Sequence, residues 1–213
     1  MSQSYFDHAA TGWDDQPQRV RLMRMIGQAI VREAHPAQTM EVLDYGCGTG
    51  LVGLYLLPYV RSVTGADSSP GMLEVLKRKV LEGGLGAMRT LRLDLEKDAV
   101  PAQRYGMIVV GMAMHHIASL ERVLKAFREL LLPDGILCIA DLDTEPGTFH
   151  PASVVVPHHG FDRGKLKTQL AEYGFCKMKD TTAVTFSKPV EGGGEQAFSI
   201  FLITARRPGP CGG

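Results

Sequence analysis

A glycine-rich loop directly after a short apolar strand constrains this chain more than any other feature. Residues 40–46, MEVLDYG, predict a buried strand, and Gly46, Gly48 and Gly50 then occupy alternate positions. Glycine adopts positive φ without steric cost and lets the backbone approach a ligand closely. In doubly wound α/β sheets the first loop of this kind lies at the carboxyl ends of the strands, where ligands bind. The loop therefore predicts a ligand site in an α/β sheet.

Strands and helices alternate around this loop. Short apolar strands separated by helical segments indicate a parallel, doubly wound sheet. Further strands are expected at 61–67, 87–93, 105–111 and 136–142, a turn at 133–135, and helices at 18–34, near 51–57, at 70–83 and at 120–131.

The last third of the chain has a different pattern. A helix is expected over 163–173, ending at Gly174, which suits the position after a helix end. Two β-rich segments follow, 180–187 and 197–205, and the glycine-rich run KPVEGGGEQ joins them. Two strands with such a connection predict a hairpin, so one antiparallel strand is expected at or near the sheet edge.

We expect one domain over residues 1–207. Its first part, residues 1–35, is predicted to form a helical cap or lid, in which an aromatic and acidic segment precedes the helix at 18–34. The Pro/Gly-rich residues 208–213 are expected to be a disordered tail.

Composition limits the class of protein. The 213 residues carry 23 Lys+Arg and 23 Asp+Glu, so the formal net charge is zero, and no nucleic-acid partner is expected. No signal peptide and no apolar run of membrane-spanning length is visible, so the expected location is cytoplasmic, without a membrane partner. Four dispersed cysteines favour reduced thiols, with Cys138 and Cys176 expected to be buried. The oligomeric state is left open.

Two acids accompany the glycine loop. Asp44 lies at the strand end, where it could hold a positively charged amine, although it could also cap the following turn. Asp67 ends the next strand, 67 − 48 = 19 residues after Gly48, and an acid at about that distance is placed to bind ribose hydroxyls. Residues 48–53 also read GxGxxG, so a dinucleotide remains an alternative. A carboxylate at Asp44 would repel a pyrophosphate and attract an amine, which favours an amino-acid-bearing cofactor.

VLDYGCGTG (42–50) resembles motif I of class I, Rossmann-like S-adenosylmethionine-dependent methyltransferases, and GADSSPGML (65–73) resembles their second motif. The small-molecule branch, which includes ubiquinone/menaquinone-biosynthesis-type enzymes, is the most similar. The resemblance implies a seven-stranded sheet of order 3-2-1-4-5-7-6, with strand 7 antiparallel and helices on both faces. It also implies a cofactor site made of Asp44, Gly46, Cys47, Gly48, Gly50, Asp67, Ser68, Met72, Asp94, Leu95, Gly111 and Met112.

Five histidines fall in the loops after the fourth and fifth expected strands. His115 is the candidate acid or base, because histidine titrates near neutral pH, and His158 and His159 are candidates for orienting the acceptor. His116 matches a family position that helps to order the loop, and it is assigned to the acceptor side. A metal centre built from His115, His150, His158 and His159 is conceivable, but the spacing matches no tight metal motif, so no metal is predicted.

The acceptor is expected to be a small molecule. The segment VGMAMHHI lacks the Asn/Asp-Pro-Pro-Tyr run of enzymes that methylate nucleic-acid bases or glutamine amides. Tyr5, Phe6 and Trp13 resemble an acceptor-covering lid. We therefore expect a methyltransferase that uses S-adenosylmethionine and acts on an O, N, S or C nucleophile. The alternatives are a non-catalytic module that binds this cofactor or S-adenosylhomocysteine, and an NAD-dependent oxidoreductase.

Overall fold

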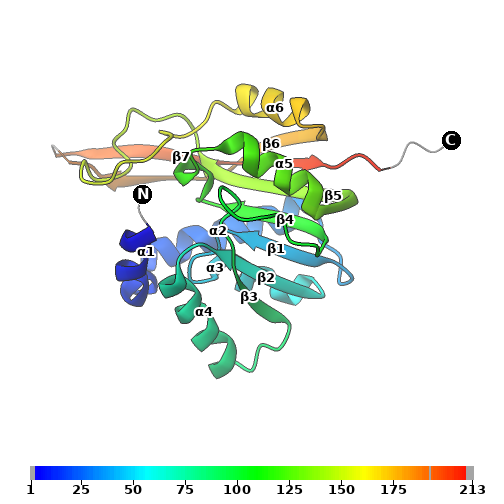
Figure 1. Cartoon of the computed structure of the whole chain (residues 1–213). Helices are drawn as coiled ribbons and strands as arrows, with labels where there is room; N and C mark the ends of the chain where they lie inside the picture. The colour runs from blue at the N-terminus through cyan, green and yellow to red at the C-terminus, as the bar shows by residue number, and fades with distance from the viewer. Residues whose placement is uncertain (1–2, 192, 210–213) are drawn as a thin grey trace.

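The computed structural model describes residues 3–191 and 193–209. Seven strands form a single sheet of order β3-β2-β1-β4-β5-β7-β6, as expected (Figure 1). Strands β1 to β5 pair in parallel, and β7 runs antiparallel to both β5 and β6. The strands are β1 Glu41–Tyr45, β2 Ser62–Asp67, β3 Met88–Arg92, β4 Tyr105–Gly111, β5 Leu131–Leu142, β6 Cys176–Pro189 and β7 Glu195–Arg206.

Helices cover both faces of the sheet. Capping residues fix two of their starts: Ser69 Oγ accepts the Met72 amide at α4, and the Asp162 carboxylate accepts the Lys165 amide at α6. The helices are α1 Gln3–Ala9, α2 Pro17–Ala34, α3 Leu51–Leu56, α4 Pro70–Glu82, α5 Leu120–Leu130 and α6 Arg163–Glu172, with short 3-10 turns η1 Ala10–Asp15, η2 Leu57–Tyr59 and η3 Met114–His116.

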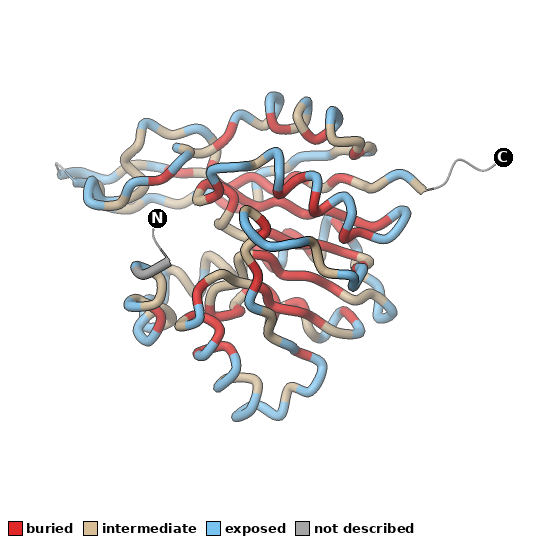
Figure 2. Tube along the Cα trace, in the orientation of Figure 1, coloured by how far each residue is buried: buried red, intermediate tan, exposed pale blue. Residues whose placement is uncertain are grey.

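Side chains alternate between the two faces of the strands and build two cores. One face of β1, β4, β5 and β7 packs against α5 and α6, with Phe127 and Leu170 fully buried. The opposite face packs against α2 and α3, where Ile26, Ile30 and Leu56 are fully buried. Figure 2 shows the buried residues concentrated along the central strands. A sheet buried on both faces leaves its strand ends free to carry polar groups.

The predicted elements are confirmed with two differences. The turn expected at 133–135 lies inside β5, where pairing with β4 shifts register between Tyr105 and Met107 and Asp134 adopts φ 59°. The hairpin strands are longer than expected, because β6 begins already at Cys176 and both strands extend into the KPVEGGGEQ segment.

The three described cysteines, Cys47, Cys138 and Cys176, are free. Cys138 is buried as expected, whereas Cys176 is only half-buried at the start of β6. Residues 210–213 of the expected tail, including Cys211, lie outside the described residues. Among the residues that the structure describes, no helix has both the length and the apolar character needed to cross a membrane.

Candidate functional site

The glycine loop connects β1 to α3 at the carboxyl edge of the sheet. Gly46, Gly48 and Gly50 all have positive φ, at 68°, 53° and 84°. A Cβ on Gly46 would lie 2.5 Å from Ala113 Cβ, and one on Gly50 would lie 2.4 Å from Leu76 Cδ1. A Cβ on Gly48 would meet only Met72 Sδ, at 3.9 Å. Gly46 and Gly50 are therefore packed against the protein, and Gly48 alone of the three presents an open face.

Asp67 joins the end of β2 to this loop. One carboxylate oxygen accepts the Gly48 amide at 2.8 Å, and the other accepts the Ser69 amide at 2.8 Å. Burial raises the pKa of Asp67, and these backbone hydrogen bonds oppose that rise. The structure thus brings the two sequence-predicted features, the glycine loop and the acid 19 residues later, into direct contact.

Asp44 has a capping contact. Its carboxylate is buried and accepts the Gly53 amide in the first turn of α3 at 2.9 Å. Burial raises the pKa of Asp44 to about 7, and the charge of Asp67 adds to the rise. The Asp44 carboxylate therefore caps the first turn of α3, which was one of the two roles considered from the sequence. An amine ligand beside Asp44 would supply a positive charge that favours the ionised carboxylate.

A pocket of about 380 Å³ lies at the ends of β2 and β3. Its lining includes Ser68 and Asp94, which were both predicted to lie beside the cofactor. Asp94 accepts the Glu96 amide at 3.0 Å and pairs with Lys97 at 2.7 Å. Leu95 instead lines a second pocket of the same volume, between the loop after β3 and α5. The first pocket is the better candidate, because its lining includes Ser68, the residue that follows Asp67.

Met72 and Cys47 face the protein interior. Met72 is buried in a small cluster with Ala10 and Val75, against which Phe6 and Trp13 pack. The Cys47 thiol faces β2, since a Cβ added at Gly65 would lie 3.1 Å from its sulfur. Burial raises the pKa of Cys47 well above its ordinary value, so the group is a thiol at neutral pH.

Gly111 ends β4, which pairs with β1 on the side opposite to β2, and Met112 follows it. A Cβ on Gly111 would lie 3.2 Å from Val52 of α3, so glycine permits close packing there. Met112 has φ 56°, and its amide donates to the Ala140 carbonyl of β5 at 2.8 Å. A non-glycine residue in the left-handed region is a strained conformation that occurs often at functional sites.

The N-terminal segment of residues 3–15 folds over this edge. Asp7 accepts the Ser69 hydroxyl at 2.5 Å and the Gly71 amide at 2.9 Å, at the start of α4. Asp14 accepts the Thr49 hydroxyl of the glycine loop at 2.6 Å and pairs with Lys79. These acids were not identified as functional from the sequence, where they read as ordinary polar residues.

The aromatic side chains predicted for a lid lie in this segment. The Phe6 ring packs edge-on against Trp13 and against His116, with centroids 5.7 Å and 5.3 Å apart. Tyr5 packs on Phe6 and is 44% exposed. The segment thus spans from the glycine loop to the histidine pair after β4.

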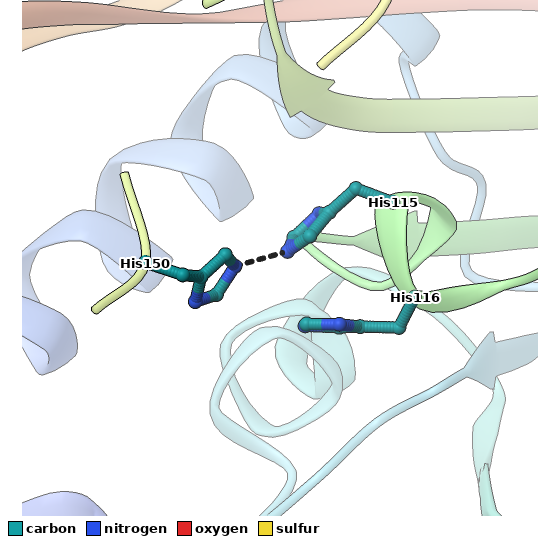
Figure 3. A group of neighbouring side chains, drawn as sticks. All are labelled: His115, His116 and His150. Carbon is teal, nitrogen blue, oxygen red and sulfur yellow. Dashed lines mark hydrogen bonds between the residues drawn. The ribbon is translucent and has the colours of Figure 1, made fainter. Parts of the chain in front are cut away.

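The histidines divide into two groups. The ligand-capable nitrogens of His115, His116 and His150 lie within 4.8 Å of one another (Figure 3). His158 Nε2 donates to the Ile117 carbonyl at 3.0 Å, and the His158 amide donates to the His115 carbonyl. The His159 side chain is 57% exposed and lies 3.5 Å from Glu145. The structure therefore gathers His115, His116 and His150, places His158 against the turn that carries His115, and leaves the His159 side chain exposed beside Glu145.

Buried Asp141 holds His115, and sequence reasoning missed it. Its Oδ1 bonds to His115 Nδ1 at 2.6 Å, and its Oδ2 accepts the His115 amide at 3.3 Å. The Nε2 atom of His115 lies 3.1 Å from Nε2 of His150. An acid at the end of an otherwise apolar strand, in ILCIADL, was the available signal.

Comparison with known proteins agrees with this geometry. Residues 42–135 match a family model described as a methyltransferase domain. An uncharacterized methyltransferase of Schizosaccharomyces pombe is 35% identical over 135 residues, which cover 57% of this chain and 48% of that protein. A ubiquinone biosynthesis O-methyltransferase of Cereibacter sphaeroides is 30% identical over 119 residues, 56% of this chain and 48% of its own length. The chain thus spans about half the length of these relatives.

The fold is also that of a solved methyltransferase. A structure described as an S-adenosylmethionine-dependent methyltransferase from Aquifex aeolicus superposes with a TM-score of 0.69 at 18% identity. The match covers 97% of this chain and 99% of the other. Likeness at this identity concerns the fold alone.

Proposed function

We propose that this chain is a class I, Rossmann-like methyltransferase and that it carries out a methyl-transfer reaction. The match of residues 42–135 to a methyltransferase-domain model and the sheet order support this proposal. The cofactor is S-adenosylmethionine, and the acceptor is a small molecule with an O, N, S or C nucleophile. The observation that carries the proposal is the hydrogen bond between the Gly48 amide and Asp67, which joins the glycine loop to the acid of the next strand.

The cofactor is assigned along this edge of the sheet. The open face of Gly48 supports an approach of the methionine portion to the loop, with Asp44 below it. Asp67 would hold the ribose hydroxyls, and the pocket beside Ser68 and Asp94 would hold the adenine. Gly111 and Met112 would then border the sulfonium. Cys47, Met72 and Leu95 contribute packing in this proposal and not polar contacts.

The acceptor side is assigned to the N-terminal segment and the histidine pair. Methyl transfer needs the nucleophile in line with the breaking S–CH₃ bond, so alignment in a closed site supplies much of the rate. Phe6, Trp13 and His116 form a wall that suits an organic acceptor, and Tyr5 lies at its exposed rim. The balanced charge of the chain supports a small acceptor over a nucleic acid. A cytoplasmic location and roles for His158 and His159 stay predictions.

The test is calorimetry of the full chain with S-adenosylmethionine and, separately, with NAD. We expect binding of the first only, weakened in Asp67→Asn by about 1–3 kcal/mol, roughly 5- to 150-fold. Asn keeps one acceptor for the backbone amides, so the variant should fold. Glu172→Ala removes an exposed carboxylate at the end of α6 and should leave affinity unchanged. Binding of NAD, or equal affinity in both variants, would refute the cofactor assignment.

A further inference from the structure

Three imidazoles converge at the end of the sheet, outside the region assigned to the cofactor. His115 and His116 come from the 3-10 turn after β4, and His150 comes from the loop after β5 (Figure 3). One ring nitrogen of each lies within 4.8 Å of the others. We propose that His115, His116 and His150 bind a divalent transition-metal ion, with Zn²⁺ as the best-matched ion.

The separation of two of the nitrogens already suits coordination. Zn–N bonds of 2.0–2.1 Å at a tetrahedral angle place two ligand nitrogens about 3.3–3.4 Å apart. The Nε2 atoms of His115 and His150 are 3.1 Å apart. His116 completes the set once its ring moves by up to roughly 1.5 Å, the difference between the 4.8 Å limit and the ideal spacing.

Asp141 orients His115 for this role. Its carboxylate accepts a hydrogen bond from Nδ1–H at 2.6 Å, so the lone pair lies on Nε2, which points at His150. A carboxylate that holds the far nitrogen of a metal-bound imidazole is the common supporting arrangement of zinc sites. When an ion binds, His150 changes tautomer. Its proton is then on Nδ1, so that the lone pair of Nε2 is free to coordinate the ion.

His116 supplies the independent observation. Its Nδ1 is a buried side-chain atom without a hydrogen-bond partner, the only one found among residues 3–191 and 193–209. Buried polar atoms of native proteins are almost always paired, and an exception points to a ligand such as a water or an ion. A cluster that served packing alone would leave this nitrogen unsatisfied.

The loop that carries His150 is built to hold it in place. The Glu145 carboxylate accepts the amides of Gly147, Thr148 and Phe149 at 2.9, 2.7 and 3.1 Å. Lys188 of β6 bonds to the Phe149 carbonyl. His150 therefore follows directly on an ordered turn, which is the pre-organisation that a ligand needs.

Three protein ligands leave one tetrahedral position open, as in catalytic zinc sites. We assign this position to the oxygen or sulfur of the acceptor, a step that rests on the proposed function. The ion lowers the pKa of the bound X–H group, whose proton leaves to solvent. The X–C bond then forms as the S–C bond breaks, giving the methylated acceptor and S-adenosylhomocysteine. The acceptor class is therefore an alcohol, phenol or thiol.

The experiment titrates the chelator-stripped full chain with Zn²⁺ by calorimetry and with Co²⁺ by absorption. We expect one ion per chain and a tetrahedral Co²⁺ spectrum. Asp141→Asn should weaken Zn²⁺ roughly 10–100-fold, and His150→Ala by more than that, because it removes a ligand and not a supporting partner. His35→Asn removes an exposed imidazole at the end of α2, at φ 47°, which Asn tolerates, and should change nothing.

Circular dichroism confirms that each variant folds, and His150→Gln replaces His150→Ala if the latter does not. Failure of wild type to bind one ion, or equal affinity in wild type and in the folded His150 variant, would overturn the metal site. S-adenosylmethionine binding is measured on the same samples. An ion without the cofactor defeats the proposed function alone, and the cofactor without an ion defeats the metal site alone.

Discussion

Two glycines of the same loop should respond differently to alanine: one substitution should mainly lower stability, and the other should mainly lower cofactor affinity. Gly50 has φ 84°, and its added Cβ would lie 2.4 Å from Leu76 in the core. The left-handed conformation costs about 1–2 kcal/mol for an L-residue. Overpacking costs a further 1–3 kcal/mol or so. Gly50→Ala should therefore lose about 2–5 kcal/mol of the free energy of unfolding.

Gly48→Ala is the matched variant. It shares the left-handed cost, at φ 53°, but its Cβ meets only Met72 Sδ at 3.9 Å. Its stability should fall by only about 1–2 kcal/mol. The new methyl group fills the open face of the loop, so S-adenosylmethionine affinity should drop at least roughly tenfold, or about 1.4 kcal/mol.

Urea denaturation measures the two stabilities, and calorimetry measures cofactor affinity under conditions where both variants are folded. Equal destabilisation would show that Leu76 yields without cost. Full cofactor affinity in Gly48→Ala would show that the ligand does not approach this face, and either result would refute the stated roles of these glycines.

Three further predictions concern acids of the same edge. Because the pKa of Asp44 is raised to about 7, the folded state binds one more proton than the unfolded state between about pH 4 and 7, so the free energy of unfolding falls as pH rises through this range. Asp44→Asn should reduce this dependence of the free energy of unfolding on pH, measured by urea denaturation. An unchanged pH dependence would contradict the prediction. Asp14→Ala removes the contacts with Thr49 and Lys79, so trypsin should cut at Arg19 and Arg21 several-fold faster than in the wild type. Asp15→Ala, at an exposed neighbouring acid, is the control. Identical cleavage rates in the two variants would show that other contacts anchor residues 3–15. Glu145→Gln should speed hydrogen exchange at the amides of Gly147, Thr148 and Phe149 by about tenfold, which corresponds to a decrease of about 1.4 kcal/mol in the free energy of local opening. Exchange protection of β4 should stay constant. Unchanged exchange at the three amides would show that other groups hold the turn.

Local patterns were sufficient to predict most of the fold. The strand before the glycine loop, the helix start at Pro70 and the helix end at Gly174 each depend on neighbouring residues, and each lies where expected. The register shift in β5 was not predictable. Pro133 and Gly135 signal a turn, and only pairing with Tyr105 makes that turn an irregularity within a strand.

The candidate site divides in the same manner. Asp67 and the glycine loop lie on consecutive βα units, so their spacing in the sequence was sufficient to predict that they belong to the same site. His150 reaches His115 from 35 residues away, through a turn organised by Glu145. No local period encodes such a contact. The predicted grouping of histidines therefore included His158, which contacts the backbone of Ile117, and His159, whose exposed side chain lies beside Glu145.

Ser69 connects two groups that have different tasks. Its amide bonds to Asp67, and its hydroxyl bonds to Asp7 of the N-terminal segment. A ligand that forms hydrogen bonds with the Asp67 carboxylate therefore changes the contacts of Ser69, which anchor this segment. The consequence is thermodynamic linkage: occupancy at one end of the site shifts the docking equilibrium of residues 3–15, and docking shifts ligand affinity by the same factor.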